Sequence, residues 1–153
     1  MNLELNNIQS IANQVVELYR DELSNKNINA SSKLSDTATA IVELNGTHLI
    51  VSLNLEHYWK YVEYGRRPGK MPPIDAIEEW VKIKPVIPNP INGKVPNTKQ
   101  LAFLIARKIG REGIEGKKPL TNISYSPEME DIIQLIKDEV VRQLKQQVLS
   151  GTS

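Results

Sequence analysis

The stretch TATAIVELNGTHLIVSL, residues 37–53, decides the fold class of this chain. Apolar residues alternate with the others on both sides of a central Asn45-Gly46 dipeptide; they are Ala38, Ala40, Val42 and Leu44 before it, and Leu49, Val51 and Leu53 after it. Alternation with a period of two is typical of strands that bury one face. Asn-Gly tolerates the positive φ angles of a two-residue turn. The pattern therefore predicts a β-hairpin with strands 37–44 and 48–53 and a turn at Asn45-Gly46.

Two long amphipathic helices are predicted outside this hairpin. From Asn6 to Lys26, and again from Ser126 to about Leu149, apolar residues recur at three- and four-residue spacings, as on one face of a helix. Ser126 suits the N-cap of the second helix, and Pro127 suits its first turn. We therefore predict an α+β fold, in which a small antiparallel sheet seeded by the hairpin packs against a long N-terminal and a long C-terminal helix, with shorter helices between.

The shorter elements follow from local spacing, from prolines and from glycines. At 153 residues the chain suits one domain, spanning 1–153. The predicted elements are a turn around Ser32–Leu34, an aromatic helix Leu55–Val62 ending at Gly65, a helix from Ile74 to about Lys84, an irregular Pro-rich loop over 85–96, a helix from Asn97 or Thr98 to about Arg111, and a short strand Leu120–Tyr125.

Composition excludes several kinds of chemistry. The chain has no cysteine, which excludes disulfides, thiol catalysis and cysteine-based metal sites. His48 and His57 stand outside any metal-binding motif, and the glycines of residues 65–70 have the wrong spacing for a nucleotide loop. The N-terminus lacks the pattern of a secretory signal, and no apolar run approaches the roughly 18 residues of a membrane span. We expect no enzyme activity, no cofactor, no metal and no membrane partner.

Charge is distributed unevenly along the chain. The formal net charge is only +1, yet residues 65–118 are strongly basic and both flanking segments are acidic. A basic strip of this kind fits either an acidic protein face or the phosphates of nucleic acid. The candidate residues for an interface or a DNA channel are Arg66, Arg67, Lys70, Arg107, Lys108, Arg111, Lys117 and Lys118.

The middle of the chain carries a recognisable order of motifs. The run YWKYVEYGRRP, residues 58–68, precedes Met71-Pro72-Pro73 and a helix with Trp80. The helical run LAFLIARKI, residues 101–109, then leads through a glycine-containing loop to Lys118-Pro119. Over about residues 30–120 this order resembles the neck and tail-completion proteins of tailed bacteriophages.

The resemblance implies a structural virion protein, assembled in the host cytoplasm, that forms a homo-oligomeric ring in the head-to-tail region as a connector or tail-completion component. It implies as partners other copies of the chain and neighbouring portal, adaptor or tail proteins, with non-specific contact to packaged DNA allowed. It carries over no catalytic residue. The residues themselves leave one alternative open, a small DNA-binding protein that uses the basic 65–118 segment.

Overall fold

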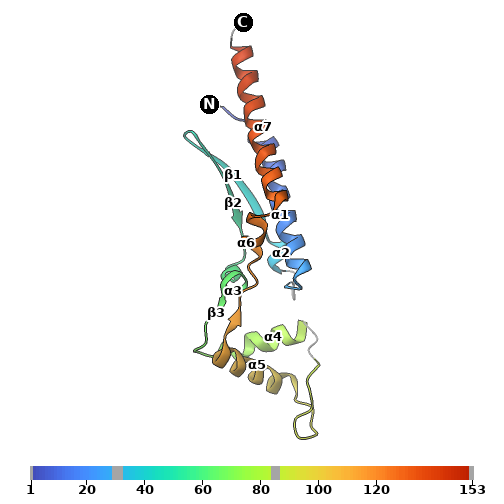
Figure 1. Cartoon of the computed structure of the whole chain (residues 1–153). Helices are drawn as coiled ribbons and strands as arrows, with labels where there is room; N and C mark the ends of the chain where they lie inside the picture. Colours follow the sequence, from blue (N-terminus) through green and yellow to red (C-terminus); the bar gives the residue numbers. More distant parts are fainter. Residues whose placement is uncertain (1, 29–32, 84–86, 152–153) are drawn as a thin grey trace.

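The computed structural model describes residues 2–28, 33–83 and 87–151 of an elongated chain, with both ends of the chain near one end of the molecule (Figure 1). Two long helices, α1 (Leu5–Asn25) and α7 (Pro127–Ser150), run antiparallel and pack along each other. The hairpin of β1 (Thr39–Asn45) and β2 (His48–Asn54) packs on α1 through β1. The short helices α2 (Lys33–Asp36) and α6 (Pro119–Ser124) complete this part, which we call the body. The predicted α+β fold is confirmed.

The remaining elements extend away from the body. Helix α3 (Trp59–Tyr64) leads into β3 (Gly65–Arg66), which pairs antiparallel with β4 (Ile114–Glu115). Between these two strands lie α4 (Ile74–Ile83) and α5 (Thr98–Glu112), which pack on each other at the end of the molecule farthest from the termini (Figure 1). We call α4, α5 and the described residues between them the arm. The arm therefore joins the body through the β3–β4 ribbon.

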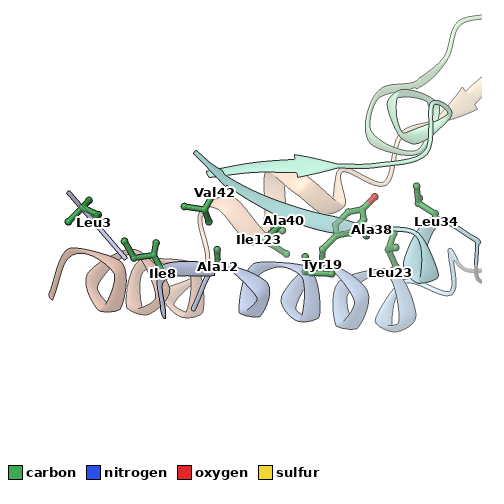
Figure 2. Close-up of a cluster of buried hydrophobic side chains, with 11 residues drawn as sticks. Leu3, Ile8, Ala12, Tyr19, Leu23, Leu34, Ala38, Ala40, Val42 and Ile123 are labelled. Atoms are coloured by element: carbon green, nitrogen blue, oxygen red, sulfur yellow. The ribbon is translucent and has the colours of Figure 1, made fainter. Parts of the chain in front are cut away.

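The core of the body lies between α1 and β1. Side chains from one face of α1, Ile8, Tyr19 and Leu23, are fully covered, and Ile123 of α6 closes the same cluster (Figure 2). Burial of each large apolar side chain contributes roughly 1.5–3 kcal/mol. The chain meets the helix here mostly with small residues, Ala38 just before β1 above Tyr19 and Leu23, and Ala40 in β1 (Figure 2). Small side chains bring the two backbones close together.

This close approach lets α1 cover the outer edge of β1. The Gln9 side-chain amide donates to the Ala40 carbonyl (2.8 Å) and accepts from the Val42 N–H (3.2 Å). The Arg20 guanidinium donates to the carbonyls of Ser35 (2.9 Å) and Ala38 (3.4 Å). Two of the backbone groups that a further strand on β1 would need, the Ala40 carbonyl and the Val42 N–H, are therefore already bonded to α1.

The N-terminal segment is fixed to α7 by a group of side chains on that helix. The buried Gln143 amide accepts from the Glu4 N–H (2.7 Å) and donates to the Glu4 carbonyl (3.1 Å) and to Glu139 (2.8 Å). Glu139 also accepts from Arg142 and Asn7. The Arg142 guanidinium, followed by the Gln143 and Asn7 amides, lowers the pKa of Glu139 from 4.5 to about 2.

Most predicted helices are found within one or two residues of their expected ends. Ser126 caps α7 through its hydroxyl, and Asn97 forms a capping box with Gln100 at the start of α5. The aromatic helix begins later than expected, at Trp59 in place of Leu55, and runs to Tyr64. Lys84 at the predicted end of α4, the first loop residues Pro85 and Val86, and Ser32 of the predicted turn lie outside the described residues.

The predicted turn of the hairpin is wrong by one residue. Asn45 pairs with His48, so the loop consists of Gly46 and Thr47, not of Asn45 and Gly46. Gly46 has φ 61°, whereas Thr47 and Asn45 are not among the residues with positive φ. A type II′ turn needs a positive φ only at its first loop residue. Gly46 alone satisfies it, so the asparagine becomes part of the strand.

The predicted strand Leu120–Tyr125 is also wrong, because residues 119–124 form helix α6. Pro119 occupies the first helical position, where the missing N–H costs nothing. Pro119 and Ile123 are buried, one turn apart on the helix. The N–H groups that start this helix are bonded to a residue distant in sequence, which the local pattern does not reveal. None of the described helices combines the length and apolarity needed to cross a membrane.

The cluster around Glu139 predicts an acid-sensitive contribution to stability. Because the folded state lowers the pKa of Glu139, its contribution is present above the unfolded value of 4.5 and is lost as the pH falls toward about 2. We expect Glu139→Gln to lower the thermal midpoint at pH 7, and the gap from the wild type to shrink between about pH 4.5 and 2. Calorimetry over this pH range checks it.

Asp131→Asn is the control, because the exposed Asp131 lies on the same helix and its carboxylate makes no hydrogen bond within the described residues. Its midpoint should differ little from the wild type at every pH. A gap for Glu139→Gln that stays constant down to pH 2 would contradict the assignment.

Candidate functional site

The predicted basic residues come from three places in the structure. Arg66, Arg67 and Lys70 lie on β3 and in the loop after it, Arg107, Lys108 and Arg111 lie in the second half of α5, and Lys117 and Lys118 follow β4. The structure brings the first two groups together. Arg66 pairs with Ile114, and the Gly69 N–H donates to the Gly110 carbonyl (2.7 Å), so the 65–70 loop lies on the C-terminal end of α5.

Backbone segments cross very closely at this junction. Gly65 has φ 75°, and a Cβ there would overlap the carbonyl oxygen of Ile114. Across the ribbon, a Cβ at Gly116 would overlap the Glu63 carbonyl oxygen, and the Lys117 N–H donates to the Val62 carbonyl (2.9 Å). Only glycine fits such an approach. We call residues 63–70 and 110–118 the crossover; two of the loops that sequence analysis treated separately therefore pack against each other.

Glu63 fixes the crossover to the body. Its side chain is only 2% exposed, and its carboxylate accepts from the N–H groups of Leu120 (2.8 Å) and Thr121 (3.0 Å) and from the Thr121 hydroxyl. These N–H groups start α6 and have no partner within the helix. A carboxylate from α3 therefore caps a helix 57 residues further along the chain. In the sequence, Glu63 is recognisable as a charged residue between Val62 and Tyr64. The sequence does not identify the N–H groups that its carboxylate binds.

Burial around Glu63 extends to Tyr19 of α1. Burial, followed by the charge of Glu63, raises the pKa of the Tyr19 phenol to about 12. The phenol therefore stays neutral beside the carboxylate at any ordinary pH. This group is structural, because it lies inside the core cluster of the body.

The basic residues of the crossover are only partly free to meet a partner. The Arg66 guanidinium donates to the Lys70 carbonyl (2.8 Å), and Arg111 and Lys108 form ion pairs with Glu112 at 2.8 and 3.9 Å. Arg67 and Lys70 have exposed side chains. The strip is therefore basic but partly neutralised at its centre.

The other three basic candidates lie away from that centre. Arg107 is positioned over the Phe103 ring, at 6.0 Å from its centroid. Lys117 donates to the Lys26 carbonyl at the end of α1 (3.2 Å), and Lys118 is the N-cap residue of α6 in a left-handed conformation. Lys117 nonetheless borders the same cleft as Arg66.

An apolar cleft of about 610 Å³ lies where arm and body meet. Trp80 and Ile77 of α4 and Ile109 of α5 face Tyr58 and Tyr61 of the α3 region across it. Arg66, Glu115 and Lys117 also border the cleft. The lining is mainly apolar and carries these charged groups at its border.

The Pro-rich loop of the arm forms a projecting finger, residues 87–96. Ile91 and Lys94 exchange two backbone hydrogen bonds (2.9 and 3.0 Å) around Asn92 and Gly93, whose φ angles of 51° and 74° match a type I′ turn. Sequence analysis treated this segment as irregular because of its prolines and did not use the Asn92-Gly93 signal. The finger carries three apolar side chains into solvent, Ile87 (92% exposed), Ile91 (51%) and Val95 (65%).

Metal-ligand clusters and buried polar side-chain atoms without a partner are both absent from the described part of the chain. Within residues 2–28, 33–83 and 87–151, no three His, Asp or Glu side chains are placed to hold a metal ion. In the same residues, every buried side-chain nitrogen and oxygen has a hydrogen-bond partner. Comparison with protein-family models, curated proteins and solved structures finds no match to this chain.

The buried cap predicts a large cost for a small change at Glu63. We expect Glu63→Gln to lower the free energy of unfolding by about 2–3 kcal/mol, because an amide presents one acceptor and places an NH₂ group against N–H donors. Urea unfolding measures this loss. Glu79→Gln is the matched control on exposed α4, with an expected change below about 0.5 kcal/mol. Equal stability of both variants would show that Glu63 does not hold α6.

Replacement by alanine should destabilise the fold more at Gly65 in the crossover than at Gly46 in the hairpin turn, although both have positive φ. Gly46→Ala places a Cβ in open space and should lower the free energy of unfolding by about 1 kcal/mol. Gly65→Ala adds a backbone overlap to the same strain, and we expect a loss of at least about 3 kcal/mol. The strain of a positive φ is common to both variants, so the difference between their free energies of unfolding measures the cost of the overlap. Similar losses would mean that the ribbon can open to accept a side chain.

Proposed function

We propose that this chain is a structural subunit of a tailed-bacteriophage particle that forms a homo-oligomeric ring in the head-to-tail region. The observation that carries a multi-subunit role is the amount of exposed surface. The chain exposes 10695 Å². A compact monomer of its mass, 17.3 kDa, exposes about 7,800 Å². An excess of roughly a third is what a subunit carries when neighbours complete its packing.

The distribution of apolar side chains supports the same role. The finger presents Ile87, Ile91 and Val95 at the arm end, and the other end of the molecule presents Val148 and Leu149 at the end of α7. Head-to-tail packing around a ring axis joins unlike patches of neighbouring molecules. The finger and the end of α7 are apolar regions at opposite ends of the molecule, so each can contact an unlike patch of a neighbouring copy.

The motif order that resembles neck and tail-completion proteins supports the choice of particle. In this chain its residues serve the architecture: Glu63 caps α6, Gly65 permits the crossover, and Lys118-Pro119 begins α6. A non-enzymatic role in connection or tail completion is compatible with such use. The proposed partners are copies of the chain and adjoining portal, adaptor or tail proteins, in a virion assembled in the host cytoplasm.

A small DNA-binding protein is the second candidate. The exposed Arg67 and Lys70 beside Arg111 favour it, since they form a cationic surface at the crossover. Glu112 lies within the same surface and reduces its charge. The two candidates differ in solution, because DNA binding weakens steeply with salt, whereas ring formation needs no nucleic acid.

The ring proposal predicts defined oligomers of the purified chain. Native mass spectrometry should detect a closed species with one subunit number, and negative-stain electron microscopy should show rings. We expect Arg66→Glu with Arg67→Glu to reduce this species at least about tenfold, because charge reversal at an interface opposes association. The monomer should remain folded, with an unchanged circular dichroism spectrum.

Lys137→Glu is the control, because Lys137 is exposed in the middle of α7, away from both the crossover and the apolar end of that helix. This variant should still form rings. A wild-type protein that stays monomeric at high concentration, and binds duplex DNA with steep salt dependence, would replace the ring proposal with the second candidate.

A further inference from the structure

The two edges of the body's hairpin differ sharply. In an antiparallel ladder, alternate residues point their N–H and C=O groups away from the partner strand. On β1 these are Ala40 and Val42, as their bonds to Gln9 demonstrate. Their cross-strand partners are Leu53 and Val51. Leu49, Val51 and Leu53 therefore direct their backbone groups outward from β2.

The outer edge of β2 is open along its whole length. No hydrogen bond from any described residue reaches the backbone groups that Leu49, Val51 and Leu53 direct outward, and β2 lies on the side of the hairpin away from α1 (Figure 1). The strand sequence HLIVSLN contains no charged residue, no proline and no glycine. Proteins usually protect exposed edges with such residues or with a covering element. An unprotected edge of seven residues is a site for strand addition.

We propose that β2 pairs with β2 of a second copy of this chain across a two-fold axis at Val51, giving a four-stranded antiparallel sheet. Among the described residues no other strand edge of this length is free of bonds, since Gln9 occupies two backbone groups in the middle of β1 and β3 and β4 are two residues long each. The second copy therefore supplies the matching edge. Two identical strands that pair antiparallel are related by a two-fold axis, so this pairing gives a symmetric dimer.

The side chains suit this pairing. Val51 lies opposite its own copy, Leu49 opposite Leu53, and Ile50 opposite Ser52, so no like charges meet. The half-exposed Ile50 and Val51 gain cross-strand neighbours. This contact is isologous and therefore distinct from the head-to-tail contacts of a ring; it does not depend on the proposed function.

Amide hydrogen exchange of the full chain tests the ladder directly. At low concentration, the N–H groups of Ile50 and Ser52 should exchange slowly, because they bond to β1, and those of Leu49, Val51 and Leu53 should exchange fast. At high concentration the second set should slow at least about tenfold, as N–H groups bonded in a ladder do. Fast exchange of Leu49, Val51 and Leu53 at every concentration would overturn the proposal.

A single introduced cysteine tests the register, because the natural chain has none. Val51→Cys should form disulfide-linked dimers under mild oxidation, since the two residues at 51 face each other. Asn54→Cys is the control on the same strand, since its copies would lie about 20 Å apart. Cross-linking at both positions alike would indicate random collision and contradict the two-fold pairing.

Charge at the axis provides the third test. Val51→Lys places two ammonium groups opposite each other, so the dissociation constant of the pair should rise at least about tenfold. Val51→Thr keeps a neutral β-branched side chain and should pair like the wild type. Pairing that survives Val51→Lys would refute a two-fold axis at this residue. Rings that form without slowed exchange at β2 would contradict the β2 pairing and leave the proposed function standing. Dimers with slowed exchange at β2 but no rings would contradict the proposed function and leave the β2 pairing standing.

Discussion

The buried carboxylate of Glu63 is the contact on which the rest of the structure depends. It lies at the end of α3, immediately before the chain leaves the body, and it holds the first turn of α6, where the chain has just returned. Because α6 leads directly into α7, the same contact sets where the long C-terminal helix begins. The segment between Gly65 and Pro119, which contains the arm, can therefore extend away without disturbing the core of the body.

Elements that depend on neighbouring residues could be predicted from the sequence. Ser126 and Asn97 cap their helices through N–H groups three residues away, and the alternation of Ala40 and Val42 placed the correct face of β1 toward the core. Helix α6 could not be predicted, because its N-terminal N–H groups bond to Glu63 across 57 residues. The hairpin turn was misplaced because Gly46 alone supplies the positive φ that a type II′ turn requires.

The candidate site shows the same limit. Composition located the basic segment, but not the pairing that places Arg66 and Lys70 on the end of α5. Nor does a count of charges reveal that Glu112 neutralises Arg111, or that Lys117 reaches the end of α1. Apart from the neighbouring Arg111 and Glu112, these are contacts between segments about 40 to 90 residues apart, made by backbone pairing and by the reach of a lysine side chain. The turn of the finger was not predicted, because its prolines indicated an irregular loop, although Asn92-Gly93 is typical of a type I′ turn.

The bonds from Gln9 to β1, and from Arg20 to the residues just before it, have a consequence for how far sheet growth can proceed. A hairpin with two open edges can add strands indefinitely and propagate into a fibre. Here the Gln9 side chain occupies two backbone groups in the middle of the outer edge of β1, so a strand can pair along the whole edge of β2 but not along the whole edge of β1. One edge of the hairpin can thus accept a strand while the other is partly occupied, and this asymmetry favours a small closed assembly over a fibre.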